Sequence, residues 1–450
     1  MNELYWCEFA WLGGDTAERG VALQVTGDRI TDVTPAVAHP PTNSTVLRGV
    51  TVPGLVNAHS HAFHRALRGR TQVGRGSFWS WREQMYAVAA RLTPDTYRQL
   101  ATAVYAEMAL AGITCVGEFH YLHHDVDGVS YADPNAMSQA VVDAAGDAGM
   151  RLTLLDTCYL TAGVDGSPLT GTQRRFGDHD PGAWAERAEG MASRVSDNVA
   201  ARMGAAIHSV RAVPAEALPV VAEWATRHDA PLHAHVSEQR AENDDCQRVH
   251  GCSPTELLAG AGALGPRMTA VHATHLSATD IGLLGGSGTG VCMCPTTERD
   301  LADGIGPARQ LDSAGSPVSL GSDSQAVIDL LQEGRGLELD QRLASGQRGH
   351  WSARELLRSV TTNGAQALGW SELGRLRCGD LADLTTIGLD SVRTSDAVST
   401  SVLETALFAA TAADVRSVVV GGRVVVNEGR HALVPDTARL LRTAVHAVLG

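Results

Sequence analysis

The sequence predicts an α/β fold, a (β/α)8 barrel with a small β-sandwich domain built from both chain ends. Three observations support this prediction. Apolar, β-rich runs alternate with Ala-rich helical stretches through the middle of the chain, hairpin patterns occur at both ends, and polar side chains gather where the apolar runs end. The chain has 450 residues, of which 44% are hydrophobic. This is enough for a barrel of about 250 residues or more and a second, smaller unit.

The two chain ends contain short predicted strands joined by tight turns. Gly27 and Asp28 separate two β-rich runs near the N-terminus, and Gly421 and Gly422 do the same near the C-terminus, which is a hairpin signal. We expect residues 1–52 and 377–450 to form one small domain, which ends in a helix over residues 436–449. The barrel is then expected over residues 53–376.

Eight apolar runs fall in the predicted barrel region, and helical stretches separate most of them. Near-continuous apolar strands that alternate with helices are typical of a parallel sheet covered by helices on its outside. The runs are Thr51–His61, Thr114–Tyr121, Leu152–Tyr159, Met203–Val210, Pro231–Glu238, Met268–His275, Gly290–Pro295 and Pro317–Ser324. The helical stretches include Pro94–Ala111, Asn135–Ala148, Trp184–Ala200, Ala215–His228 and Pro254–Ala261.

The composition excludes several kinds of function. All 36 basic residues are arginine, so the chain cannot use a Schiff-base lysine, a phosphate-loop lysine or a carbamylated lysine between two metals. The formal net charge of -14 argues against binding to nucleic acid or to anionic membranes. The 8 cysteines include no CxxC pair, no apolar stretch reaches transmembrane length, and no signal peptide is recognisable. We therefore expect a cytoplasmic protein with free thiols.

Side chains that can bind a metal follow several of the predicted strands. His59 and His61 stand two residues apart at the end of the first run, so both imidazoles point to one side of a strand. An HxH pair alone is a weak signal, because two ordinary histidines give the same pattern. The fifth, sixth and eighth runs add His235, His272 and Asp323. Neutral imidazoles with one carboxylate suit a catalytic zinc or ferrous ion.

These motifs resemble the amidohydrolase superfamily and, within it, the mononuclear deaminase branch. The resemblance covers essentially the whole chain, including the split β-domain. It is carried by the segment Val52–His61, by His235 with Glu238, by His272 and by Gly321–Ser324. The absence of lysine agrees with it, because the binuclear branch with a carbamylated lysine cannot be built from this sequence.

The resemblance implies a role for each polar residue at the strand ends. His59, His61, His235 and Asp323 would bind one Zn²⁺ ion, with Fe²⁺ as the alternative, and the ion would lower the pKa of a bound water. Asp323 would accept the proton of the water, Glu238 would protonate the substrate nitrogen, and His272 would polarise the attacked centre. These roles suit the addition of hydroxide to a C=N carbon followed by loss of ammonia.

Further motifs are most similar to enzymes of this branch that hydrolyse N-formimino-L-glutamate to N-formyl-L-glutamate and ammonia in histidine degradation. Such a substrate has two carboxylates, which arginine binds through paired hydrogen bonds. Arg82 lies in a predicted long loop, and Arg211 follows the fourth run. We assign to the substrate the residues His64, Arg82, Tyr121, His208 and Arg211. The motifs are Ala62–Gly69, Phe78–Tyr86, Gly117–His123, His208–Arg211 and His235–Cys246.

Several alternatives to this prediction stay open. His64 stands where the family usually has Gln, so another formimino amino acid is an alternative substrate. An aminohydrolase for a purine, pyrimidine or nucleoside would be favoured if Arg82 and Arg211 pointed away from the cavity. A homologue without catalysis would have lost a ligand, and no ligand is missing. The resemblance implies a homodimer. No role is assigned to His123, His124, His233, His275, Trp79 and Trp81.

Overall fold

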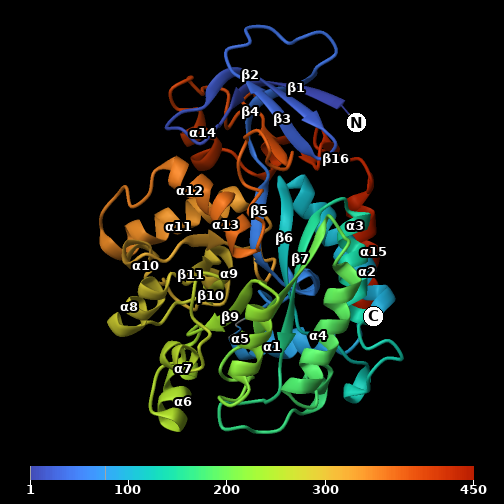
Figure 1. Ribbon diagram of the computed structural model, residues 1–450, viewed down its shortest axis with the longest axis vertical. Coiled ribbons are helices and arrows are strands. Elements are labelled where there is room, and N and C mark those ends of the chain that lie inside the picture. The colour runs from blue at the N-terminus through green and yellow to red at the C-terminus, as the bar shows by residue number, and fades with distance from the viewer. Residues whose placement is uncertain (1, 75, 77) are drawn as a thin grey trace.

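Eight parallel strands form a nearly closed barrel in the middle of the chain (Figure 1), as the sequence predicts. The computed structural model describes residues 2–74, 76 and 78–450, and the side chains of all of these except Phe78 and Trp79. Each barrel strand pairs in parallel with the next one along the chain. The strands are β5 (Leu55–Ser60), β6 (Ile113–His120), β7 (Arg151–Cys158), β8 (Ala201–Ile207), β9 (Leu232–Val236), β10 (Met268–His272), β11 (Gly290–Met293) and β12 (Val318–Leu320).

The barrel closes where the segment after β12 meets β5. The backbone N–H of His61 donates to the carbonyl of Asp323 over 3.1 Å, and the N–H of Asp323 donates to the carbonyl of His59 over 3.0 Å. Gly321 makes this approach possible, because a Cβ atom at this position would lie 2.7 Å from the carbonyl oxygen of His59. The seam between the first and last strands is thus formed by the predicted metal ligands.

Helices cover the outside of the barrel. Helix α2 begins with a capping box at Thr93 followed by Pro94, a favourable first residue for a helix. The helices that follow barrel strands are α2 (Pro94–Leu110), α3 (Ala136–Asp147), α4 (Pro181–Val195), α5 (Leu218–Arg227), α6 (Arg240–His250), α7 (Pro254–Gly260), α8 (Ala278–Ser287), α9 (Pro295–Asp300), α10 (Ala308–Ala314), α11 (Leu330–Ser345), α12 (Ala353–Ser359) and α13 (Thr362–Ala367). Short 3-10 helices lie at Ala62–Leu67, Val126–Gly128, Gly171–Arg175 and Ala412–Asp414.

The two chain ends form one mixed sheet of eight strands, at the top of Figure 1. The N-terminal strands β1 and β4 pair in parallel, and β4 pairs with β13 from the C-terminal part in the antiparallel sense. The strands are β1 (Asn2–Ala10), β2 (Glu18–Thr26), β3 (Arg29–Thr34), β4 (Thr45–Pro53), β13 (Leu384–Ile387), β14 (Val415–Val420), β15 (Arg423–Asn427) and β16 (Arg430–His431). Helix α14 (Val402–Phe408) precedes β14, and the last helix, α15 (Thr437–Leu449), packs beside α2 on the barrel.

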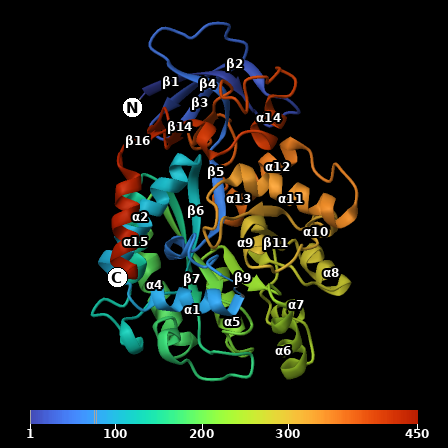
Figure 2. The same cartoon turned by 180° about the vertical axis from the view of Figure 1, so that it is seen from behind.

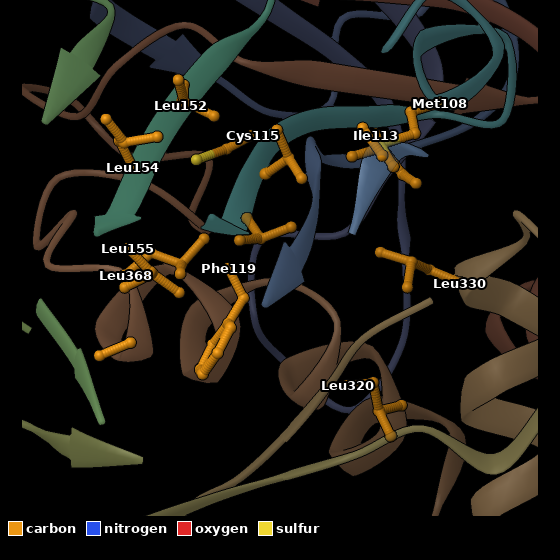
Figure 3. Close-up of a cluster of buried hydrophobic side chains, with 14 of the residues drawn as sticks. Met108, Ile113, Cys115, Phe119, Leu152, Leu154, Leu155, Leu320, Leu330 and Leu368 are labelled. Atoms are coloured by element: carbon orange, nitrogen blue, oxygen red, sulfur yellow. The ribbon is translucent and has the colours of Figure 1, made fainter. Parts of the chain in front are cut away.

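The buried core below the polar end of the barrel includes aliphatic side chains and the ring of Phe119. Leu152, Leu154 and Leu320 are among the buried residues of this cluster (Figure 3). Phe119 belongs to the same cluster, and its ring centroid lies 4.3 Å from that of His235 and 5.1 Å from that of His59. The histidines at the strand ends therefore rest on a rigid apolar layer.

The composition leads to expectations about the cysteines and about membrane-spanning helices. All eight cysteines carry free thiols, and six of them are buried. In the described part of the chain, none of the helices combines the length and the apolar character needed to cross a bilayer.

Candidate functional site

Four side chains that the sequence analysis names as metal ligands meet at the carboxyl ends of the barrel strands. One donor atom from each of His59, His61, His235 and Asp323 lies within 4.8 Å of the others. The Oδ1 atom of Asp323 is 3.3 Å from the Nε2 atoms of both His59 and His61. The Nε2 atom of His235 is 3.2 Å from that of His59. The spacing of two in the HxH motif therefore does place both rings on one side of β5.

Backbone carbonyls set the direction of two of the rings. The Nδ1 atom of His61 lies 2.9 Å from the carbonyl oxygen of Phe119, and that of His235 lies 2.8 Å from the carbonyl oxygen of His208. A carbonyl only accepts, so each Nδ1 carries the proton and each Nε2 presents a lone pair. The cluster thus gathers lone pairs and a carboxylate, and this donor set fits a divalent metal ion.

Burial and charge together set the protonation states of the cluster. Burial lowers the pKa of His59 to about 3, so this imidazole is neutral near pH 7. Burial alone would raise the pKa of Asp323, but the adjacent imidazoles of His59 and His61 outweigh it and hold that pKa well below its usual range. A neutral imidazole and an ionised carboxylate are the forms that coordinate a metal.

Two of the strand-end residues have a strained backbone. His272 has a φ of 67° and Asp323 a φ of 41°, in the left-handed region that residues with a Cβ rarely adopt. Such residues cost about 1–3 kcal/mol each and are found where the surrounding structure holds them in place, often at active sites. Both residues belong to the sites predicted from sequence.

Glu238 and His272 lie next to the metal cluster. The Nε2 atom of His272 is 3.8 Å from the Oε1 atom of Glu238 and 3.8 Å from the Oδ2 atom of Asp323. Burial raises the pKa of Glu238 above its usual value, which favours a carboxyl group that can hold and release a proton. Burial alone would lower the pKa of His272, but Glu238, Glu298 and Asp323 outweigh it and raise that pKa well above its ordinary value.

One cavity joins this cluster to the residues assigned to the substrate. His61, His235, Glu238, His272 and Asp323 line its inner end, which we define by these five residues. The outer end is defined by Trp81, Arg82, Tyr86 and Arg211. Between them, the walls are formed by His64, Met85, Tyr121, Tyr159, Phe176, His208 and Leu301.

The two arginines of the outer end come from different elements. Arg82 lies on helix α1 (Phe78–Ala89), at the end of the barrel away from the small sheet (Figure 2), so the prediction of a loop here is wrong. The glycines before it suggest a loop, and the mixture of charged and apolar residues in α1 hides the helical period. The Nε atom of Arg82 donates to the hydroxyl of Tyr86, one turn further along, over 2.6 Å.

Arg211 follows β8 and is placed for an anionic ligand. Burial alone would lower its pKa, but the carboxylates of Glu242 and Glu238 contribute to a net rise, so the guanidinium keeps its charge. Its Nε atom is buried and has no hydrogen-bond partner among the described residues. Buried polar groups usually find a partner, so this N–H is a candidate to bind a ligand.

The middle of the cavity brings together the other three residues assigned to the substrate. The Nε2 atom of His64 lies 2.8 Å from the hydroxyl of Tyr121. The ring centroid of Tyr121 is 5.4 Å from that of His208. Burial lowers the pKa of His64 well below its ordinary value, so the ring is neutral. One of its nitrogens then donates a hydrogen bond and the other accepts one.

Two buried carboxylates that the sequence analysis did not single out support the site. Glu118, on β6, accepts from the hydroxyl of Ser60 over 2.8 Å and from the backbone N–H of Ala62 over 2.6 Å, on either side of His61. Glu298, on α9, has its Oε1 atom 3.5 Å from the Nδ1 atom of His272. An acidic residue directly after the seventh strand is the signal that could have indicated Glu298.

The other polar residues at the strand ends lie outside the cavity. His120 stacks on Tyr97 of α2, and His123 lies 2.9 Å from the carbonyl of Thr157. His124 contacts Asp178, His233 contacts the carbonyl of Ala367, and His275 lines a separate cleft. Trp81 lines the cavity, whereas the side chain of Trp79 is outside the described part of the structure.

Comparison with known proteins places this site in a family. The sequence profile of the amidohydrolase family matches residues 50–425. The chain belongs to the amidohydrolase family. It is therefore a hydrolase of carbon–nitrogen bonds, as the sequence analysis expected. An amidohydrolase from Brucella melitensis of known crystal structure has 34% sequence identity and a TM-score of 0.92, with 100% of both chains covered.

Two curated relatives of this amidohydrolase carry names for different substrates. Formimidoylglutamate deiminase of Pseudomonas aeruginosa is 38% identical over 403 residues, which is 87% of this chain and 88% of the relative. The 8-oxoguanine deaminase of the same organism is 32% identical over 354 residues, 77% of this chain and 76% of the relative. An adenosine deaminase from Xanthomonas campestris with bound zinc has the same fold, with a TM-score of 0.84, 23% identity and coverage of 99% and 97%.

Proposed function

We propose that this amidohydrolase hydrolyses N-formimino-L-glutamate to N-formyl-L-glutamate and ammonia. One observation carries the proposal: Arg82 and Arg211 line the same cavity as Glu238, His272 and Asp323. The substrate has a small formamidine at one end and two carboxylates at the other, so it needs reacting groups and fixed positive charges in one cavity. The 38% identity to a formimidoylglutamate deiminase supports the same substrate.

The proposed reaction adds water to the C=N carbon and then breaks a C–N bond. Asp323 is placed to accept a proton from the attacking water, and Glu238 is placed to pass a proton to the substrate nitrogen. The new C–O bond becomes the formyl C=O when the protonated nitrogen leaves as ammonia. His272 presents its Nε2 atom beside Glu238, where it can hydrogen bond to the carbon's new oxygen substituent.

Zinc is the proposed ion at His59, His61, His235 and Asp323, and ferrous iron is the alternative. When bound, a divalent metal makes a water molecule sufficiently acidic to act as a nucleophile near pH 7. The other proposed roles belong to side chains: Arg82 and Arg211 bind the carboxylates, and His64, Tyr121 and His208 orient the rest of the substrate. A homodimer, a cytoplasmic location and a place in histidine degradation also stay predictions.

The first experiment measures ammonia release from N-formimino-L-glutamate by protein loaded with Zn²⁺ or with Fe²⁺. N-formimino-glycine, which lacks the second carboxylate, is the matched control substrate. We expect ammonia release from the glutamate compound. For the glycine compound we expect a kcat/KM of at most about one hundredth of that value, because a charge-assisted contact is lost. Equal turnover of the two would contradict the proposed role of the two arginines.

A nucleobase aminohydrolase is the second candidate, and one observation favours it. The cavity wall contains several rings, from Trp81, Tyr86, Tyr121, Tyr159 and Phe176, and flat heterocycles stack on such rings. The identity of 32% to an 8-oxoguanine deaminase agrees with this candidate. Cytosine, guanine, 8-oxoguanine and adenosine therefore belong in the same assay. Turnover of one of these bases in place of the formimino compound would replace the proposed substrate.

A further inference from the structure

His272 faces a carboxylate through each of its ring nitrogens. Its Nε2 atom looks into the cavity, 3.8 Å from Glu238 and 3.8 Å from Asp323. Its Nδ1 atom faces away from both, toward the Oε1 atom of Glu298 at 3.5 Å. His272 is almost fully buried, as is Glu298, so water does not compete for this contact.

Glu298 is itself held in place by the barrel. Its Oε1 atom accepts from the backbone N–H of Cys294 over 2.8 Å, and its own N–H donates to the carbonyl of Cys294 over 3.0 Å. Its carbonyl accepts from the N–H of Asp303 over 2.9 Å. Cys294 follows β11, which pairs in parallel with β10, the strand that ends at His272. The carboxylate is thus fixed relative to the strand that carries the histidine.

A fixed carboxylate at Nδ1 determines how the ring of His272 is turned. Glu298 attracts the N–H at Nδ1, and this leaves Nε2 on the side of Glu238 and Asp323. The Nε2 atom then remains for the reaction, in the cavity beside Glu238. The left-handed backbone at His272, with φ of 67°, needs such support, because a strained residue keeps its conformation only where its surroundings hold it.

We propose that Glu298 is a positioning residue, which fixes the ring plane of His272 and directs its Nε2 atom to the reacting carbon. The inference rests on the proposed function only in that His272 takes part in the reaction. Glu298 touches neither the cavity nor the four metal ligands in the described contacts, so its effect has to pass through His272.

The test compares three variants of the metal-loaded protein. In Glu298→Ala the acceptor is lost, and we expect kcat to fall about 10- to 100-fold with KM within about threefold. In Glu298→Gln the amide oxygen can still accept at Nδ1, and we expect kcat to stay within about fivefold of the wild-type value. Glu333→Gln is the matched control: this buried glutamate binds Thr296 at the start of α9 and does not touch His272. It should leave kcat and KM unchanged.

A second readout tests the inference without any substrate. In protein labelled with ¹⁵N-histidine, the signals of His272 are identified by their loss in His272→Asn. At a pH at which the ring of His272 is neutral, we expect Nδ1 to carry its single proton in the wild type and in Glu298→Gln, and a mixture of the two tautomers in Glu298→Ala. If no candidate substrate is hydrolysed by the wild type, the proposed function fails, while this measurement still decides on Glu298.

Two results would overturn the inference. One is a Glu298→Ala protein that keeps its kcat, or whose His272 keeps the proton on Nδ1. The other is a Glu298→Gln protein whose kcat falls as far as that of Glu298→Ala, which would show that charge and not position matters. If Glu298→Ala does not fold, Glu298→Asp replaces it: this carboxylate is one methylene further from the ring, and we expect the same loss of kcat.

Discussion

The inner and outer ends of the cavity are built in different ways. At the inner end, His61 and His235 are held by backbone carbonyls, and His272 and Asp323 by buried carboxylates and imidazoles. At the outer end, Arg82 is held by Tyr86 of its own helix, and the Nε atom of Arg211 has no protein partner in the described part of the chain. The inner end belongs to the barrel, whereas the outer end lies on segments outside the strands. Residues of the outer end can therefore be substituted without altering the barrel.

This difference suggests how one family can act on different substrates. The two relatives from Pseudomonas aeruginosa are 38% and 32% identical to this chain over the aligned residues and are named for an amino-acid derivative and a purine. We expect such relatives to share the residues of the inner end, which carry out the reaction, and to differ at the outer end, which binds the rest of the substrate.

The largest effect is expected from Asp323→Asn at the inner end. The variant keeps the size of the side chain but loses the charge that joins His59 and His61. We expect it to bind less metal and kcat to fall by roughly 1000-fold or more, since each 1.4 kcal/mol of lost transition-state stabilisation costs about tenfold. Metal content by elemental analysis and kcat measure this. Asp390→Asn, at an exposed ion pair with Arg416, is the control, and full metal content in Asp323→Asn would contradict the proposed ligand set.

A smaller effect, and one of a different kind, is expected at the outer end. Arg211→Met and Arg82→Met should each raise KM by about 10- to 100-fold and leave kcat within about threefold, because a hydrogen bond to a charged group is worth about 1.5–3 kcal/mol. Steady-state kinetics over a range of substrate concentrations separates the two constants. Arg98→Met, on the exposed side of α2, is the matched control. If kcat fell in the Arg82 or Arg211 variants while KM stayed the same, the outer end would act in the reaction and not in substrate binding.

Variants of His64 test the middle of the cavity. His64→Gln can still hydrogen bond to the hydroxyl of Tyr121, so we expect kcat/KM within about fivefold of the wild type. His64→Leu leaves this buried hydroxyl without its polar partner, which costs about 1–3 kcal/mol, and we expect kcat/KM to fall about tenfold. If the two variants behave alike, the hydrogen bond to Tyr121 has no part in substrate binding.

A prediction of another kind concerns stability behind the inner end. Burial raises the pKa of Glu333 to about 8, whereas in an unfolded chain it is about 4.3. The folded state therefore binds this proton more tightly, and the resulting stabilisation is full below pH 4.3 and is lost as the pH rises through 8. Glu333→Gln cannot ionise, so its free energy of unfolding should improve relative to the wild type between pH 5.5 and pH 8.5. Urea unfolding at the two pH values measures this, and a constant difference would contradict it.

Most of the barrel and the inner end could be predicted from sequence because they follow short-range rules. Continuous apolar runs indicate buried parallel strands, and a spacing of two puts His59 and His61 on one face. The run Thr51–His61, however, is two strands, β4 in the small sheet and β5 in the barrel. The end of β4 that belongs to this run and the whole of β5 are buried on both faces, so no change of pattern marks the boundary at Gly54.

Other features depend on contacts between segments that are distant in sequence. Glu118 supports His61 from the neighbouring strand, and Glu298 reaches His272 from helix α9, so only the packed barrel shows their roles. Helix α1 was missed because its sequence mixes charged and apolar residues without a clear stripe. The sequence pattern of a single segment therefore predicts the side chains that face the cavity. It predicts less well the side chains that support them from other segments.

The seam of the barrel links metal loading to the synthesis of the chain. His59 and His61 leave the ribosome early, but Asp323 is added only when nearly three quarters of the 450 residues have been made. Until then the first strand has no last strand to pair with, and two of the ligands lack the carboxylate between them. A chain that ends before Asp323 therefore cannot assemble the complete ligand set, and we expect it not to retain the ion.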